Sequence, residues 1–319
     1  MSGSADPVVE AALAAASSAL GRPLEDLGSL GGSDRSNVHR AADGADTCVV
    51  KGYALDHRSS WARERVGLGA AGALGLAPRL LATAADPHLV VMEDLGSAPS
   101  VADHLLGGDA RAADDALVAW ACTLGALHAR THPVRVTLRA EFTGAEAEVA
   151  GAEPADRFHA GVDGSVSEAT AAWATIGEQL GIADPPDVEA LGAPLRDEDH
   201  HALSPADACP DNNLLLDEGC RLIDFEWAEV RHPAWDASYL SVPWPTCWCS
   251  WQIPAGTAER ALDVYREAAV PGIAYVGDDA FLDDLAVARA CWALISVSWS
   301  LATALREDQQ PHPASPATR

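Results

Sequence analysis

The chain has 319 residues, of which 48% are hydrophobic and 21% are charged, and these fractions are typical of a folded globular protein. They exclude a disordered or collagen-like chain. The 47 acidic residues against 21 Lys and Arg give a formal net charge of −26. This excess argues against nucleic-acid binding, which needs a basic surface to neutralise phosphates, and against docking on anionic lipid.

No run reaches the roughly 18 to 20 apolar residues that a membrane span requires, and the longest candidate, 293–305, predicts a buried helix. Residues 1–10 lack the basic region of a signal peptide. The seven cysteines are an odd number without regular spacing, which favours a reducing, cytoplasmic compartment. Cys247 and Cys249 lie near His232 in sequence, so a metal site is one interpretation, but buried thiols are the favoured one.

The first 94 residues predict a small lobe of mixed helix and strand. The expected elements are, in chain order, a helix over 8–20, a glycine turn near 30–32, a strand over 47–53, a helix over 61–74 that starts at Ser59 or Ser60, and a strand over 88–92.

Beyond Asp94 the patterns become mainly helical. Ser100 and Asp103 have the spacing of a capping box. Apolar residues at spacings of three and four predict a long helix over 111–130, and the polar, glycine-rich stretch over 133–165 predicts a long connection.

The predicted fold class is therefore α+β with two lobes. We expect a small N-terminal lobe over 1–94 and a large, mainly helical lobe over 95–308. A flexible tail is expected over 309–319, which is rich in proline.

Lys51 is the only lysine in the chain, and the other 20 basic residues are arginine. It lies at the end of the apolar strand predicted over 47–53. Arginine does not replace lysine where a compact point charge is needed, so this position is a candidate for such a site. Chance survival of one lysine on a strand edge is the alternative.

A predicted hairpin brings polar residues together in the second half of the chain. Its strands, 214–216 and 221–223, are joined by a tight Asp-Glu-Gly turn. The loop before the first strand contains Asp207 and Asn212, and Asp224 follows the second strand. Because both segments lie at the hairpin end opposite the turn, we expect these three side chains to be close together.

Two carboxylates and an amide at one hairpin end are the oxygen ligands that a hard cation such as Mg²⁺ prefers. Asn212 and Asp224 would suffice, since Mg²⁺ takes one or two protein ligands and completes its shell with water and phosphate. Asp207 would then be available to accept a proton from a substrate hydroxyl. The alternative is a loop that is merely rich in turn-forming residues.

These residues resemble a known family. Asp207-x4-Asn212, followed by Asp224 in Leu-Ile-Asp-Phe, resembles the catalytic segment of the aminoglycoside phosphotransferase and choline kinase-like superfamily. The resemblance covers about residues 28–240. Other motifs agree in order and spacing, namely Gly31-Gly32-Ser33, Val49-Val50-Lys51, Glu64, Val91-Met92-Glu93-Asp94-Leu95, Leu124-Gly125-Ala126-Leu127-His128 and a structural aspartate, Asp236.

The resemblance implies a bilobal, protein kinase-like fold that binds ATP or GTP. Lys51 would pair with the α- and β-phosphates of the nucleotide, held in place by Glu64. Further nucleotide contacts would come from the phosphate-covering loop and the hinge, that is from Gly31, Gly32, Ser33, Ser36, Glu93 and Leu95.

The resemblance also assigns roles in the second lobe. Asn212 and Asp224 would hold Mg²⁺, and Asp207 would accept the proton of the acceptor alcohol. The family usually has His-Gly before this aspartate, where this chain has Pro205-Ala206. A nucleotide-binding pseudokinase with a regulatory role is therefore an alternative. A protein kinase is disfavoured, because no Asp-Phe-Gly or Ala-Pro-Glu motif is present.

Two features bear on the acceptor, which we expect to be a small hydroxylated molecule. The negative charge would attract a cationic, aminoglycoside-like acceptor, although it also serves solubility. Aromatic residues between 227 and 251 suit a quaternary ammonium or a flat ligand, although they suit a hydrophobic core better. An amino alcohol or sugar derivative is the alternative acceptor, and the sequence leaves the oligomeric state open. Candidate acidic residues of the acceptor pocket are Asp211, Glu226, Glu229 and Asp236.

Overall fold

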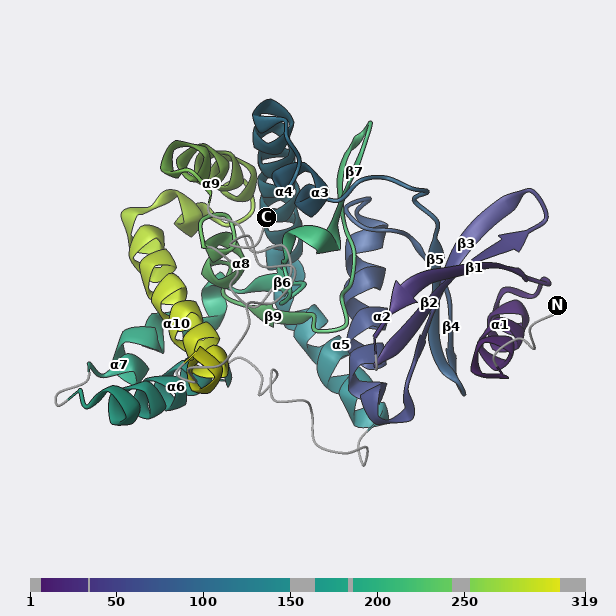
Figure 1. Cartoon of the computed structure of the whole chain (residues 1–319), viewed down its shortest axis with the longest axis horizontal. Helices are drawn as coiled ribbons and strands as arrows, with labels where there is room; N and C mark the ends of the chain where they lie inside the picture. The colour runs from purple at the N-terminus through teal and green to yellow at the C-terminus, as the bar shows by residue number, and fades with distance from the viewer. Residues whose placement is uncertain (1–6, 34, 150–163, 183–185, 243–252, 305–319) are drawn as a thin grey trace.

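The computed structural model describes residues 7–33, 35–149, 164–182, 186–242 and 253–304. A five-stranded antiparallel sheet near the N-terminus stands beside a mainly helical part that holds most of the remaining chain (Figure 1). The predicted α+β class with a small sheet lobe and a large helical lobe is confirmed.

The sheet has the strand order β1-β2-β3-β5-β4, and every neighbouring pair is antiparallel. The strands and the two helices that accompany them are, in chain order, α1 (Pro7–Leu20), β1 (Glu25–Gly32), β2 (Ser36–Asp43), β3 (Asp46–Tyr53), α2 (Arg58–Ala73), β4 (Leu80–Ala85) and β5 (His88–Glu93).

Side-chain alternation on β3 determines which of its residues pack against α1 and which pack against the main core with α2. Cys48 and Val50 pack with α1 in a small apolar cluster, whereas Val49 and Tyr53 face the main core together with Trp61 of α2. Because successive strand residues point to opposite faces, Lys51 shares the α2 face with Val49 and Tyr53.

Helix α2 is longer than predicted and starts before the two serines. Its N-cap is His57, and Ser60 is buried within the helix, so the predicted serine cap is wrong. Gly67 does not break the helix. A Cβ there would lie 2.7 Å from the Cβ of Ala228 and 2.9 Å from the ring of Phe225, so the glycine allows close approach of the segment that follows Asp224.

The helical part contains two small sheets. Its elements are α3 (Val101–Leu105), α4 (Ala110–Thr131), α5 (Arg135–Glu148), α6 (Gly164–Leu180), α7 (Val188–Gly192), β6 (Ala202–Ser204), β7 (Asn213–Leu216), β8 (Gly219–Leu222), β9 (Glu229–Arg231), α8 (Ala234–Ser238), α9 (Ala255–Ala269) and α10 (Asp279–Ala304). β6 pairs with β9, and β7 pairs with β8.

Several predictions for this part are confirmed and one is wrong. The capping box at Ser100, the long helix and the hairpin are present. The stretch over 133–165 is not simply a connection, because α5 occupies much of it. The buried residues Leu138, Phe142 and Ala145 recur at helical spacing within the polar sequence, and they fix this helix on the core.

Some expectations lie outside the described residues. These are the tail over 309–319, the Cys247–Cys249 pair and the tryptophans between 244 and 251. Within the described part of the chain, no helix has the length and apolar character needed to cross a bilayer.

His201 gives the fold a pH dependence. It is fully buried before β6, its Nε2–H donates to Leu195 O at 3.2 Å, and its Nδ1 accepts from Arg139 at 3.0 Å. Burial lowers its pKa to about 4, from 6.5. The unfolded chain therefore binds more protons, and stability should fall as the pH decreases from about 6.5 to 4.

We expect His201→Gln to flatten this acid limb in urea unfolding measured across that pH range. His57→Gln, at a half-buried position, is the matched control. An unchanged acid limb in the His201 variant would contradict the assignment.

Candidate active site

Lys51 lies at the centre of a cluster of carboxylates between the sheet and the helical part. Its Nζ donates to Glu64 Oε2 at 3.0 Å and to Asp224 Oδ1 at 2.6 Å, and it lies 3.3 Å from Glu226 Oε2. Tyr53 also donates to Glu64, at 3.0 Å. The strand, α2 and the segment after the hairpin thus converge on one ammonium group.

Electrostatics keep this lysine charged. Burial alone would lower the pKa of Lys51, but the charges of Asp224 and Glu64 raise it well above its usual value. The side chain is 7% exposed, so its ammonium group remains fixed as a positive charge in a largely dry site. Such a charge suits an anionic group of a ligand.

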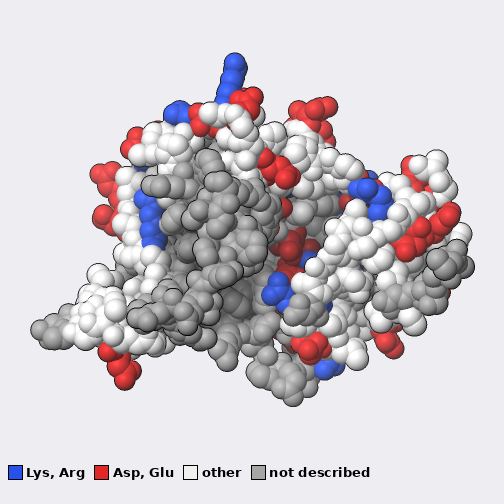
Figure 2. All heavy atoms as spheres, in the orientation of Figure 1, with Lys and Arg blue, Asp and Glu red and all other residues white. Residues whose placement is uncertain are grey.

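Arg35 is a residue of the site that sequence reasoning missed. It follows β1, and its guanidinium forms a 3.0 Å ion pair with Glu226 and lies 5.1 Å from the ring centroid of Trp227. Glu226 thereby joins Lys51 and Arg35 across the two parts of the molecule. Figure 2 shows acidic and basic atoms together in the hollow between these parts. No local sequence signal marks this pair, because its members are 191 positions apart.

The predicted phosphate-covering residues form the turn between β1 and β2. Gly31 and Gly32 have φ of +125° and +144°, and a Cβ on Gly32 would lie 2.4 Å from Ser36 O. The amide of Ser33 donates to the same carbonyl at 2.8 Å, and the Ser33 hydroxyl accepts from the amide of Arg35 at 3.1 Å. Glycine at position 32 is therefore required for this tight turn.

The hairpin end brings together the backbone segments that carry Asp207, Asn212 and Asp224. Asn212 Nδ2 donates to the carbonyl of Asp207 at 3.1 Å, and the carbonyl of Asn212 accepts from the amide of Ile223 at 2.9 Å. The second bond ties Asn212 to the residue directly before Asp224. Asp224 adopts φ of +66°, a conformation that aspartate tolerates better than most residues.

A buried network holds the loop that carries Asp207. Asp236 accepts from Ser204 Oγ at 2.8 Å and lies 3.0 Å from His128 Nε2. Arg231 also donates to Asp236, and it donates to the carbonyl of Ala206 at 3.1 Å. Burial alone would raise the pKa of Asp236, but the charge of Arg231 and the bond from His128 lower it to about 2.

Solved structures resemble this architecture over most of its length. They include an ethanolamine kinase of Plasmodium vivax (TM-score 0.55, 12% identity, covering 90% of this chain and 78% of that one). A macrolide 2′-phosphotransferase of Brachybacterium faecium gives a TM-score of 0.52 at 18% identity, covering 94% of both chains. An aminoglycoside-3′-phosphotransferase of type VIII gives 0.50 at 20% identity, covering 85% and 93%.

The chain has a protein kinase-like fold. No family model matches the sequence, and no curated protein matches it either. At these identities the structural likeness establishes the fold, and the argument for function depends on the site itself.

Within the kinase-like fold, the predicted hinge residues lie on the connection between β5 and α3. Glu93 accepts from the side chain of Arg79 at 3.2 Å, and its amide donates to the carbonyl of the same arginine. Arg40 binds Asp94 through two hydrogen bonds, at 2.7 and 3.0 Å. These bonds fix the connection, and Leu95 follows at a half-buried position.

The kinase-like fold also changes the interpretation of the acidic acceptor residues. Glu226 faces Lys51 and Arg35, Glu229 lies 3.5 Å from Arg231, and Asp236 supports the loop that carries Asp207 from a fully buried position. These three carboxylates therefore already have partners within the protein, and their assignment to an acceptor pocket stays a prediction.

Two oxygen donors fit a magnesium site. Asn212 and Asp224 are held on neighbouring backbone segments, and the side chain of Asp224 is 33% exposed. Among the described residues, no group of three or more His, Cys, Asp or Glu side chains is arranged to hold a metal ion. A cation here would need ligands from water and substrate phosphate, which is the usual coordination of Mg²⁺.

Ala206 stands where the resembled family usually has glycine, and its backbone conformation is one that favours glycine. Ala206 has φ of +62°, which costs a residue with a Cβ about 1 kcal/mol or more. The loop nevertheless keeps this conformation, because the amide of Ala206 donates to Ser204 Oγ at 2.8 Å and its carbonyl accepts from Arg231.

We expect Ala206→Gly to raise the free energy of unfolding by up to about 1 kcal/mol, because glycine adopts this conformation without strain. Urea unfolding measures the change. Ala140→Gly, at an exposed position of α5, should have the opposite sign and cost about 1 kcal/mol. Equal losses at both positions would show that Ala206 is not strained.

Proposed function

We propose that the chain is a small-molecule kinase that transfers the γ-phosphoryl group of ATP or GTP to a hydroxyl. The observation that carries the proposal is the convergence of Lys51, Glu64 and Asp224 at distances of 3.0 and 2.6 Å beside the loop of Asp207 and Asn212. This arrangement combines a fixed cation for phosphates, oxygen donors for Mg²⁺ and a carboxylate for the acceptor.

The chemistry follows from this placement. Lys51 binds the α- and β-phosphates, and the glycine turn with Ser33 and Ser36 covers them. Asp207 orients the acceptor hydroxyl and takes its proton as the new oxygen–phosphorus bond forms. The bond from the γ-phosphorus to the bridging oxygen breaks, and the nucleoside diphosphate leaves. Mg²⁺ at Asn212 and Asp224 supplies neutralisation of phosphate charge when bound.

Several narrower points belong to the same proposal. The boundary between the lobes lies at Asp94, and the connection from Glu93 to Leu95 holds the nucleotide base. An aminoglycoside-like molecule is the leading acceptor, and an amino alcohol or sugar derivative is the alternative. A cytoplasmic location belongs to the same proposal, since the seven cysteines are an odd number without regular spacing.

A nucleotide-binding pseudokinase is the second candidate, favoured by Pro205-Ala206. Against it, hydrogen bonds to the backbone hold the loop of Asp207 next to Asn212 despite this replacement. The two candidates differ in turnover, not in nucleotide binding.

The test is mass spectrometry of products formed from ATP or GTP with Mg²⁺ and a panel of aminoglycosides, macrolides, other hydroxylated antibiotics and amino alcohols. The Asp207→Asn protein is incubated in parallel. A product heavier by one phosphoryl group that is missing with the variant would support the kinase. Nucleotide binding without transfer to any panel member would favour the pseudokinase over an antibiotic kinase.

A further inference from the structure

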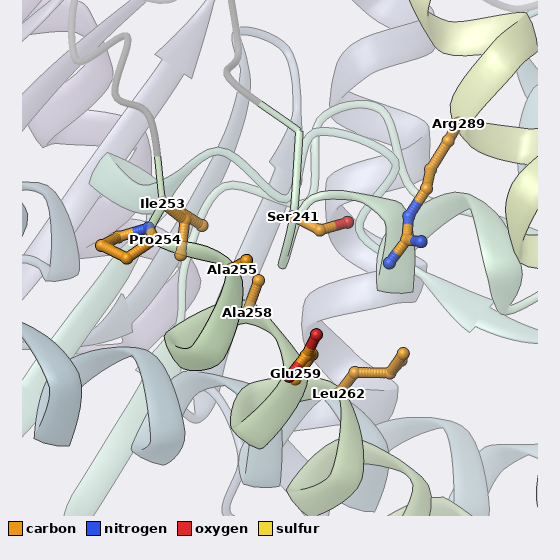
Figure 3. A pocket seen from close by; sticks show the side chains of 8 residues that line it. All are labelled: Ser241, Ile253, Pro254, Ala255, Ala258, Glu259, Leu262 and Arg289. Atoms are coloured by element: carbon orange, nitrogen blue, oxygen red, sulfur yellow. The ribbon is translucent and has the colours of Figure 1, made fainter.

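A pocket of about 560 Å³ lies between the start of α9, Arg289 of α10 and Ser241, which follows α8, and it is apart from the cluster around Lys51. Its size is that of a small-molecule binding site. Apolar side chains from the start of α9 form one wall, and Arg289 of α10 extends toward Ser241 and Glu259 (Figure 3). The apolar members of the lining are Ile253, Pro254, Ala255, Ala258 and Leu262.

Arg289 is a half-buried cation without an ion-pair partner among the described residues. Its Nε is buried without a hydrogen bond, and no described residue forms an ion pair with its guanidinium. Burial lowers the pKa of this arginine. A partly desolvated cation without a partner is costly, and this chain has 47 acidic residues from which a partner could have come. Glu259 lines the same pocket but is exposed to solvent.

Tyr239 is close to the charge of Asp207, the proposed catalytic base, and its ring packs near α10, the helix that carries Arg289. It is buried at the end of α8, and its pKa is raised well above the usual value by burial and by the charge of Asp207. Its ring lies 5.3 Å from that of Trp292, centroid to centroid. Trp292 is three positions after Arg289 on α10, so both lie on neighbouring parts of one helix face.

We propose that this pocket binds an anionic group, a carboxylate or a phosphate, at the end of a partly apolar acceptor. Arg289 forms the charge-assisted hydrogen bonds, and the residues of α9 cover the apolar body. The inference rests on the proposed function only in taking the ligand as the phosphoryl acceptor. It selects an acidic hydroxylated molecule over the polycationic antibiotics that the net charge favours.

The test is a calorimetric titration, without nucleotide, of three probes with the same ring: 4-(hydroxymethyl)benzoate, neutral 1,4-benzenedimethanol and cationic 4-(aminomethyl)benzyl alcohol. We expect the carboxylate to bind about tenfold more tightly than the neutral probe. Arg289→Gln should remove this preference, and Arg289→Lys should retain it. Arg260→Gln is the matched control, since Arg260 lies on α9 outside the pocket and is paired with Asp114 at 2.6 Å.

Thermal unfolding without ligand gives a second readout. Removing an unpaired cation should leave the midpoint of Arg289→Gln unchanged or raise it, whereas Arg260→Gln loses an ion pair. A lower midpoint for Arg289→Gln would identify a structural residue and overturn the proposal. So would equal binding of the three probes, or a preference that survives Arg289→Gln. The titration contains no nucleotide, so its result does not depend on phosphoryl transfer. Absence of anion binding and absence of phosphoryl transfer can therefore be told apart.

Discussion

Asp207→Asn is expected to lower kcat by roughly 10²–10⁴-fold, because the amide cannot accept the proton of the acceptor hydroxyl. Nucleotide affinity should change little. The backbone of Asp207, which accepts from Asn212, is the same in the variant, and Lys51, which we propose to bind the phosphates, lies on β3. Single-turnover kinetics and nucleotide titration separate the two effects.

The hairpin offers a matched control for this variant. Asp217→Asn makes the same chemical change at the exposed turn, at the opposite end of β7 and β8 from Asp207. It should leave kcat within about twofold of the original protein, since an exposed turn charge is screened by solvent. Full activity of Asp207→Asn, or an equal loss in both variants, would remove Asp207 from the role of base.

Lys51→Met is expected to damage both stability and catalysis. It leaves Glu64, Asp224 and Glu226 without their shared cation, and breaking a buried ion pair typically costs about 3–5 kcal/mol. Loss of a fixed charge that stabilises phosphates should lower kcat/KM by about 10²–10³-fold. Urea unfolding and steady-state kinetics measure the two quantities.

The loss of stability in Lys51→Met should depend on pH. Burial and the charge of Asp224 raise the pKa of Glu64, and removal of Lys51 takes away the charge that opposes them. A carboxyl whose pKa is raised in the folded state stabilises at low pH and loses that contribution as the pH rises. The deficit should therefore be larger at pH 7 than at pH 5. Lys51→Arg, which keeps the charge, should show a smaller deficit, and a pH-independent loss would contradict the electrostatic explanation.

The sequence was most informative about the parts of the candidate site whose residues are close together along the chain. The hairpin and the segment from Asp207 to Asn212 are local, so the turn and the strand pattern were enough to predict that the backbone segments of Asp207, Asn212 and Asp224 meet. The position of Lys51 on a strand followed from its β-branched neighbours in the same way.

Long-range pairing was the part that the sequence could not supply. Arg35 meets Glu226 only because the β1–β2 turn folds over the segment after the hairpin, and nothing near either residue indicates the other. Glu226 was therefore assigned to the acceptor by its charge and by its closeness in sequence to the hairpin end. Helix α5 was missed for a related reason, because its three buried residues are diluted among polar ones and become informative only against the core.

The presence of a single lysine, with its ammonium group enclosed by carboxylates, gives this protein an unusual chemical property. A reagent that acylates amines has one side-chain target in the whole chain, and that target lies inside the cleft. Enzymes that attach acetyl groups or ubiquitin to lysine have no surface lysine to modify. Any treatment that exposes the ε-amino group can therefore be followed by labelling of one residue, and the rate of that labelling reports how often the contacts of Lys51 with Glu64 and Asp224 open.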